Sequence, residues 1–328
     1  MSQEHPSASD HPSLLPLETE PALAYPWTAP PPRPKFQHRY GRHLALFAAT
    51  FLTTTYAQSF LAFFIALGQG VFIPGVFGWQ FFVGGLWYSV PLLTILAAHE
   101  FGHYLACRYY NVDATLPYFL PMPLVLTGTL GAVIRIREAF PSKQALFDIA
   151  VAGPIAGFVV LVPFLVIGVW LSGTAQVTEG SLYFGEPLLF KLLERLRFGD
   201  LGPDMDSVLH PMGFAAWFGM LATALNLLPF GQLDGGHISY SLFGRRASWV
   251  SIGTLLAAVG LTAVSVSWVT MTILMLAMAF FLGVRHPRVV DEHVPLTGGR
   301  RLVALLALFI FIICFTPVPI EFLIGEGG

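Results

Sequence analysis

Long apolar runs separated by short polar stretches dominate the amino-acid sequence. A helix needs about 20 predominantly apolar residues to cross the hydrocarbon core of a bilayer. The pattern therefore predicts an all-α polytopic membrane protein with about seven transmembrane helices, give or take one. The segments lie at about 44–67, 80–106, 148–171, 209–229, 249–265, 268–284 and 302–324, with bounds accurate to a few residues.

The fifth and sixth of these segments are short, and only Val266 and Ser267 separate them. They predict either a tight helical hairpin or a membrane-spanning helix beside a re-entrant segment. The stretch from Gly128 to Arg137 ends in alternating apolar and basic residues, which predicts a small membrane-associated β-hairpin. A loop at about 172–208 contains an amphipathic stretch, Pro187 to Phe198, that is expected to lie on the membrane surface.

The chain before the first apolar segment has a different composition. Residues 1–42 are rich in Pro, Ser, Glu and Asp and include the run Pro30 to Pro34 (PPPRP), which predicts a disordered, Pro-rich tail. They lack the apolar stretch of a cleavable signal peptide. We therefore divide the chain into this tail at 1–42 and one transmembrane domain at 43–328.

Charged residues make up 11% of the chain, against roughly 25% in an ordinary soluble domain. The net charge of −2 gives no reason to expect binding to nucleic acid. Lys and Arg collect on the cytoplasmic side of membrane helices, so we predict a cytoplasmic N-terminus. That orientation places every basic residue inside except Lys191, Arg195 and Arg197. Cys107 and Cys314 do not suggest a disulfide framework.

The string from His99 to His103 (HEFGH) reads as H-E-x-x-H and lies inside the second apolar segment. Residues four apart on a helix are about 5–6 Å apart on one face, so both imidazoles can bind one zinc ion. Zinc acidifies a bound water, and Glu100 can accept its proton as the water attacks a peptide carbonyl. A helix-packing hydrogen-bond cluster is the alternative, and the cost of burying ionisable groups in a membrane disfavours it.

Catalytic zinc usually takes three protein ligands, and we predict that Asp234 is the third. It follows the fourth apolar segment, where Pro229 and Gly231 should interrupt the helix and let the chain fold back. The predicted topology puts this break near the same membrane face as the H-E-x-x-H helix. Taken alone, Asp-Gly-Gly would be better explained as an ordinary turn at the membrane exit.

With both motifs present in this order, the chain resembles the site-2 protease family of intramembrane zinc metalloproteases. Leu233-Asp234-Gly235 matches the L-D-G motif of that family, and residues 152–157 (AGPIAG) match a glycine-rich segment between the motifs. The resemblance covers about 90–240 and places the catalytic core at about 80–240.

The resemblance implies ligand and base roles for the residues of the two motifs. One catalytic Zn²⁺ would be held by His99, His103 and Asp234, with Glu100 as the general base. Asn226 would have a catalytic role in positioning the substrate or stabilising an oxyanion, and hydrogen bonding between helices is an equal alternative for this residue.

The resemblance also implies a function. The enzyme would hydrolyse peptide bonds in or near transmembrane segments of membrane-anchored proteins, after an upstream site-1-type protease has trimmed them. The loop at about 172–208 is too short for a PDZ domain, so the chain is similar to the PDZ-lacking members. The expected location is the bacterial inner (plasma) membrane.

Two other functions fit the same polar residues. His99, Glu100 and His103 could form the path of a membrane ion or metal transporter, or belong to a proteolytically inactive homologue that only binds substrate.

Gly153 and Gly157 predict a close helix approach rather than chemistry, and His237 suits a loop near the membrane surface. For a protease, we expect the strand from Gly128 to Arg137 to pair with an unwound substrate.

Overall fold

The computed structural model describes residues 34–57, 59, 78–123, 126–176, 182–202, 205–283, 289–292 and 295–322. The described residues from Lys35 onward belong to one compact unit. Most of the predicted Pro-rich tail, and the second half of the first apolar segment, lie outside the described residues.

The described part of the chain is mostly helical, with three small antiparallel strand pairs, β1–β2, β3–β5 and β4–β6. The helices are α1 Tyr40–Thr55, α3 Trp79–Tyr109, α4 Lys143–Leu171, α5 Leu188–Phe198, α6 Pro211–Leu227, α7 Asp234–Phe243, α8 Ala247–Leu261, α9 Ser267–Leu282 and α10 Gly298–Cys314. The strands are β1 Tyr118–Pro121, β2 Thr129–Val133, β3 Gly173–Gln176, β4 Leu182–Phe184, β5 Met205–Val208 and β6 Ile320–Phe322.

Among the described residues, two helices are long and apolar enough to cross a membrane: α3 with 31 residues and α4 with 29. The apolar helices α6 and α9 are shorter. The prediction of about seven full-length spans is therefore not met within this part of the chain. The difference lies in helix length: α6, α8, α9 and α10 have 15 to 17 residues each, fewer than the roughly 20 that cross a bilayer.

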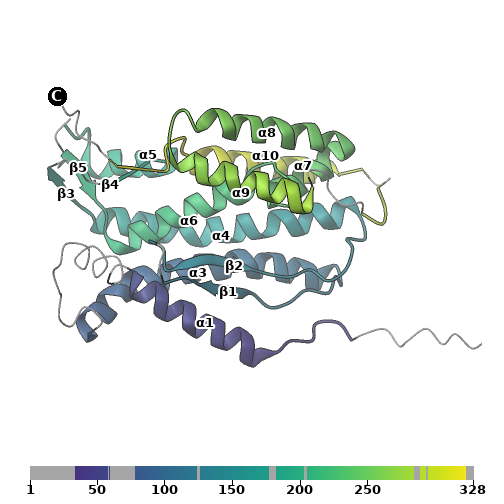
Figure 1. Cartoon of the computed structure of the whole chain (residues 1–328), viewed down its shortest axis with the longest axis horizontal. Helices are drawn as coiled ribbons and strands as arrows, with labels where there is room; N and C mark the ends of the chain where they lie inside the picture. The colour runs from purple at the N-terminus through teal and green to yellow at the C-terminus, as the bar shows by residue number, and fades with distance from the viewer. Residues whose placement is uncertain are drawn as a thin grey trace, which may run out of the picture. The chain divides into compact units, whose positions relative to one another are not determined.

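Helices α3, α4 and α6 pack side by side at the centre of the unit, with α1 beyond α3 and with α8 and α9 on the opposite side (Figure 1). Small residues allow the central helices to approach closely. A Cβ added at Gly102 would lie 2.5 Å from the Ala152 carbonyl oxygen, and one at Gly168 would lie 2.3 Å from the Gly213 Cα. Both distances are too short for any side chain, so glycine is required at these crossings.

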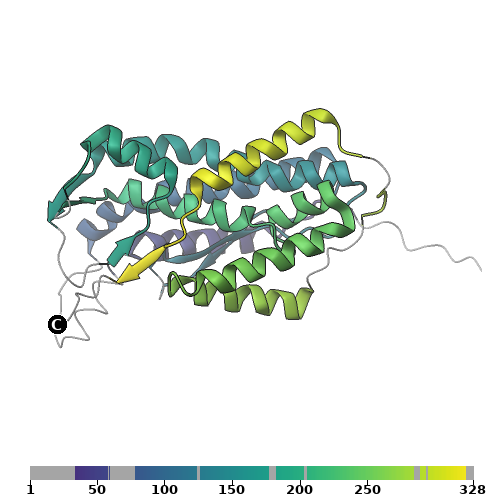
Figure 2. The same cartoon turned by 90° about the horizontal axis from the view of Figure 1, so that it is seen from above.

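Two further helices cover the central group. Helix α10 lies along α4 and α6, as the yellow ribbon in Figure 2 shows, and buries Ala307, Ile310 and Cys314 in the main apolar core. The predicted amphipathic stretch forms α5, which exposes a stripe of Leu188, Leu192 and Leu196.

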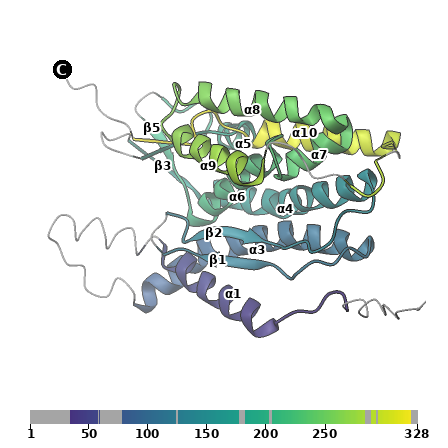
Figure 3. The same ribbon diagram turned by 45° about the vertical axis from the view of Figure 1, so that its right-hand side comes forward.

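The predicted β-hairpin is confirmed, with a shorter strand than expected. Strands β1 and β2 lie beside α1 and α3 (Figure 3), and the chain pairs Tyr118 with Val133 and Phe119 with Ala132. Beyond Val133 the pairing is reduced to an isolated bridge between Ala114 and Ile136. Among the described residues, the other edge of β2 pairs with no strand.

Candidate metal centre

His99 and His103 lie one turn apart on the same face of α3, as their spacing predicts. Both are buried, and their rings lie 4.8 Å apart, with 3.1 Å between the two Nε2 atoms. The side chain of Asp234 completes the group, because its Oδ2 atom lies 3.3 Å from each Nε2. The structure thus brings together the three residues expected from sequence to bind a metal.

The three ligand atoms suit one small cation. Zinc is bound by imidazole nitrogen and carboxylate oxygen at about 2.0–2.1 Å, and ligands at two corners of such a tetrahedron are about 3.3 Å apart. The observed separations of 3.1, 3.3 and 3.3 Å agree with that spacing. The residues present therefore fit a zinc ion, with a fourth position left for water or substrate.

Asp234 reaches this position because the chain reverses between α6 and α7. The predicted break at Pro229 and Gly231 is confirmed, and Gly231 has a φ of 53°. Asp234 is then the first residue of α7, a helix that the sequence pattern did not predict. The following Gly235 packs against α6, where an added Cβ would lie 2.1 Å from the Leu227 carbonyl oxygen. The Asp-Gly-Gly sequence therefore packs tightly instead of forming a simple exit turn.

Two glycines of α4 lie directly against the imidazoles. A Cβ at Gly153 would lie 2.1 Å from the His103 Nε2 atom, and one at Gly157 would lie 3.1 Å from the His99 Cβ. Sequence reasoning assigned both glycines to helix packing alone. Gly153 and Gly157 have the same i, i+4 spacing as the two histidines that they face. This shared spacing could have indicated from the sequence alone that the glycines contact the site.

A backbone carbonyl on α4 sets the orientation of one ring. His103 Nδ1 lies 2.8 Å from the Ile149 carbonyl oxygen. A carbonyl can only accept a hydrogen bond, so Nδ1 carries a proton, and Nε2 is the nitrogen that faces Asp234 and is placed to bind a metal. Metal-binding histidines usually have such a partner on the second nitrogen.

Glu100 and Asn226 lie at the edge of the group. Glu100 is buried and lines the same cavity as Ile134, which lies just beyond β2. Asn226 Nδ2 on α6 lies 3.4 Å from the His99 Nε2 atom. The structure therefore places Asn226 beside one of the metal-binding histidines. A residue that served only to join helices would not need this position.

A cavity of about 310 Å³ opens beside His99, Glu100 and Asn226. Its walls come from β2, α3, α6 and α9 and are mostly apolar; we call it the reaction cavity. The α9 wall consists of Met271, Leu274, Met275 and Met278. A second cavity of about 230 Å³ touches all three metal-binding residues and is also lined by His237.

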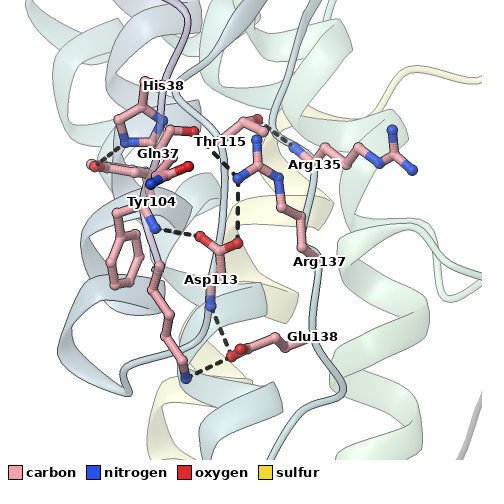
Figure 4. Close-up of polar contacts among 10 residues, drawn as sticks. Gln37, His38, Tyr104, Asp113, Thr115, Arg135, Arg137 and Glu138 are labelled. Carbon is pink, nitrogen blue, oxygen red and sulfur yellow. Dashed lines mark hydrogen bonds and ion pairs between the residues drawn. The ribbon is translucent and has the colours of Figure 1, made fainter. Parts of the chain in front are cut away.

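Polar contacts join the segment before α1 to the base of the β1–β2 hairpin (Figure 4). Asp113 accepts a hydrogen bond from the Phe36 N–H at 2.6 Å and pairs with Arg137 at 3.3 Å. Glu138 pairs with Lys35 at 2.8 Å and accepts from the Asp113 N–H, and these two bonds hold the pKa of its carboxyl below the ordinary value. The segment before α1 is thereby fastened to the strand that borders Glu100.

The sequence was compared with known families and proteins. The model of peptidase family M50 matches residues 87–267, which include both motifs. The probable zinc metalloprotease EGY2, chloroplastic, of Arabidopsis thaliana is 29% identical over 74% of this chain and 44% of its own length. EGY1 of the same plant is 34% identical over 48% of this chain and 29% of its own. EGY3 of Oryza sativa subsp. indica is 30% identical over 75% and 45%.

This chain thus spans less than half the length of these curated relatives. Zinc is the metal in their names, and it is the metal that the two imidazoles and one carboxylate fit. The family match covers more than half of the chain and includes the site described above. The resemblance to site-2 proteases is confirmed, and the chain belongs to peptidase family M50.

Proposed function

We propose that this protein is an intramembrane zinc metalloprotease that hydrolyses peptide bonds in or near transmembrane segments of membrane-anchored proteins. One observation carries the proposal: His99, His103 and Asp234 converge beside the carboxylate of Glu100, on buried helices that border an apolar cavity. Membership of family M50 supports the same reading.

Each residue has a task in this reaction. His99, His103 and Asp234 would hold zinc, which supplies a Lewis acid that polarises the scissile carbonyl and acidifies water. Glu100 accepts the proton of the attacking water and returns it to the leaving nitrogen. The Glu100 side chain lines both cavities beside the metal-binding residues, where it can reach this water.

Asn226 is proposed to hold the substrate carbonyl. Its side chain lines the reaction cavity, and its amide nitrogen lies close to His99. An amide donor there could hydrogen-bond the oxyanion that develops as the carbonyl is attacked. Hydrogen bonding between helices accounts less well for a side chain that borders the cavity and is only partly buried.

A transmembrane substrate must unwind before its peptide bonds can react, and β2 offers a partner for the unwound strand. Arg135 faces the segment that leads into β1, because its carbonyl accepts a hydrogen bond from the Thr115 N–H at 3.0 Å. Strand residues alternate in direction, so the N–H groups of Ala132 and Ile134 face away from that segment. Ala132 and Ile134 line the same cavity as Glu100. A substrate strand added at this edge would lie across the base.

Replacing Ala132 by Pro tests this pairing. Proline lacks the N–H group that faces the substrate and is tolerated at strand edges. We expect cleavage of a transmembrane reporter to fall about tenfold, as one lost hydrogen bond of about 1.4 kcal/mol implies. Ala132→Val, which keeps the N–H group, is the matched control. Full activity of the proline variant with unchanged reporter crosslinking would refute pairing at β2.

The membrane arrangement is part of the proposal. We infer about seven spans in a transmembrane domain at 43–328, with the catalytic core at about 80–240 and the tail at 1–42 in the cytoplasm. The distribution of Lys and Arg supports this orientation. The exposed leucine stripe of α5 would rest on the membrane surface at the other side. A bacterial plasma membrane and an upstream site-1-type protease complete the expected setting.

The two alternative functions have less support. A transporter needs polar groups along a path, and the walls of the reaction cavity are mainly leucine, alanine and methionine. An inactive homologue would not need a buried carboxylate beside the metal-binding group.

Zinc removal tests the proposed function directly. We expect the purified protein in lipid nanodiscs to contain about one zinc ion per chain and to cleave a transmembrane reporter. A strong chelator should abolish cleavage, and added Zn²⁺ should restore it, because a site of two imidazoles and one carboxylate binds this metal reversibly. Metal content is measured by mass spectrometry and cleavage by gel. Cleavage that persists in the zinc-free protein would refute the assignment.

A further inference from the structure

Arg300 joins three helices where α3 ends and where α4 and α10 begin. Its Nε and Nη2 atoms donate to the two oxygens of Asp148 on α4, at 2.9 and 2.6 Å. Its Nη2 also lies 3.2 Å from the hydroxyl oxygen of Tyr110, the residue that caps the end of α3. Tyr110 in turn donates a hydrogen bond to Asp148. We call these three residues the Arg300 clamp.

The clamp acts on the part of α4 that touches His103. Asp148 directly precedes Ile149, whose carbonyl oxygen accepts the hydrogen bond from His103 Nδ1. One turn further along α4, Gly153 lies against the same imidazole. A small shift of this turn along α3 would move the acceptor away from His103 and push the α4 backbone toward its ring.

Attachment of α10 does not explain the clamp by itself. The other half of α10 is already buried in the core through Ala307, Ile310 and Cys314. Just before α10 begins, the Pro295 carbonyl also accepts a hydrogen bond from the Gln144 side chain of α4 at 3.0 Å. The planar guanidinium of Arg300 adds two parallel hydrogen bonds, which fix both the distance and the relative orientation of α10 and α4. Holding α10 against the core would not require a fixed orientation at this point.

We propose that the Arg300 clamp is a positioning device for His103, so that α10 helps to build the zinc site. The inference rests on the zinc site of the proposed function. Helix α10 lies outside the residues that match the family, 87–267. Arg300 is a positioning residue, and it lies on a helix that the family match does not include. It acts through Asp148 and the Ile149 carbonyl, without touching the metal.

The test measures zinc affinity, which does not depend on a substrate. Zinc-stripped full-length protein in nanodiscs is titrated with Zn²⁺ against a chromophoric chelator. Loss of a partner that orients a ligand costs about 10–100-fold in metal affinity, so we expect Arg300→Gln to weaken binding about tenfold. Arg301→Gln removes the same charge from the exposed neighbouring residue and should change affinity less than about twofold.

Further variants separate positioning from stability. Arg300→Lys keeps the charge without the paired geometry and should give an intermediate affinity. Asp148→Asn combined with Arg300→Gln should weaken binding no more than the larger single change, because both act through one unit. Tyr110→Phe provides a milder variant that keeps the ion pair. The Co²⁺-substituted protein should show a shifted visible spectrum in Arg300→Gln, because the ligand geometry has changed.

Two results would overturn the inference. If Arg300→Gln binds Zn²⁺ as tightly as the wild type and has the same Co²⁺ spectrum, the clamp only attaches α10, even if the melting temperature falls. If Arg300→Gln does not fold, unchanged zinc affinity in Arg300→Lys, which loses the paired geometry, has the same meaning. A wild-type protein that binds no zinc would instead refute the proposed function itself, so the two failures are distinguishable.

Discussion

Glu100→Gln is expected to abolish measurable cleavage while leaving zinc bound. Glutamine has nearly the same shape as glutamate but cannot accept the proton of the attacking water. General-base catalysis typically contributes about 10²–10⁴-fold to a rate, so the loss should be at least about 100-fold. Zinc should remain at about one ion per chain, because the three ligand atoms come from His99, His103 and Asp234.

The measurement combines zinc content with cleavage of a transmembrane reporter in nanodiscs. Asp200→Asn is the matched control, because Asp200 is an exposed carboxylate that lies outside both cavities. It should keep nearly full activity. Cleavage by Glu100→Gln at more than about one tenth of the wild-type rate would contradict the role of Glu100 as the base.

Gly153→Ala is expected to disrupt the zinc site with a single added methyl group. The new Cβ would lie 2.1 Å from the His103 Nε2 atom, so the imidazole or α4 must move. Moving the ring takes Nε2 away from Asp234, and moving α4 breaks the hydrogen bond to the Ile149 carbonyl. Zinc affinity should therefore fall at least about 100-fold, the upper end for loss of a group that orients a ligand.

The control for this variant is Gly253→Ala on α8, where an added Cβ meets nothing within 4 Å. It should leave zinc affinity and thermal stability unchanged or slightly improved, because alanine favours the helix. Gly157→Ala should have a smaller effect, since its Cβ would lie 3.1 Å from the His99 Cβ. Wild-type zinc affinity in Gly153→Ala would show that the imidazole does not occupy the position seen in the structure.

The local pattern of apolar and polar residues predicted many of the helices and the residues of the two motifs. The apolar runs located most of the helices, because a helix that faces lipid or other helices must be apolar over its length. The H-E-x-x-H spacing placed His99 and His103 on one face of α3, since helix geometry alone sets their separation. Pro229 and Gly231 together predicted the break that precedes Asp234, because both residue types disfavour a helix interior. The alternating residues after Gly128 indicated the β-hairpin.

Other features depended on contacts between residues far apart in the chain, which no local pattern encodes. The structure decided that Gly153 lies against His103, that Ile134 and Glu100 line one cavity, and that Asn226 lies near His99. It also showed α7 and shorter helices at several predicted spans, because capping and chain reversals set helix ends more than hydropathy does. The sequence by itself thus pointed to the residues that are expected to carry the chemistry. Only the tertiary structure decided how close they come, because helix packing sets those distances.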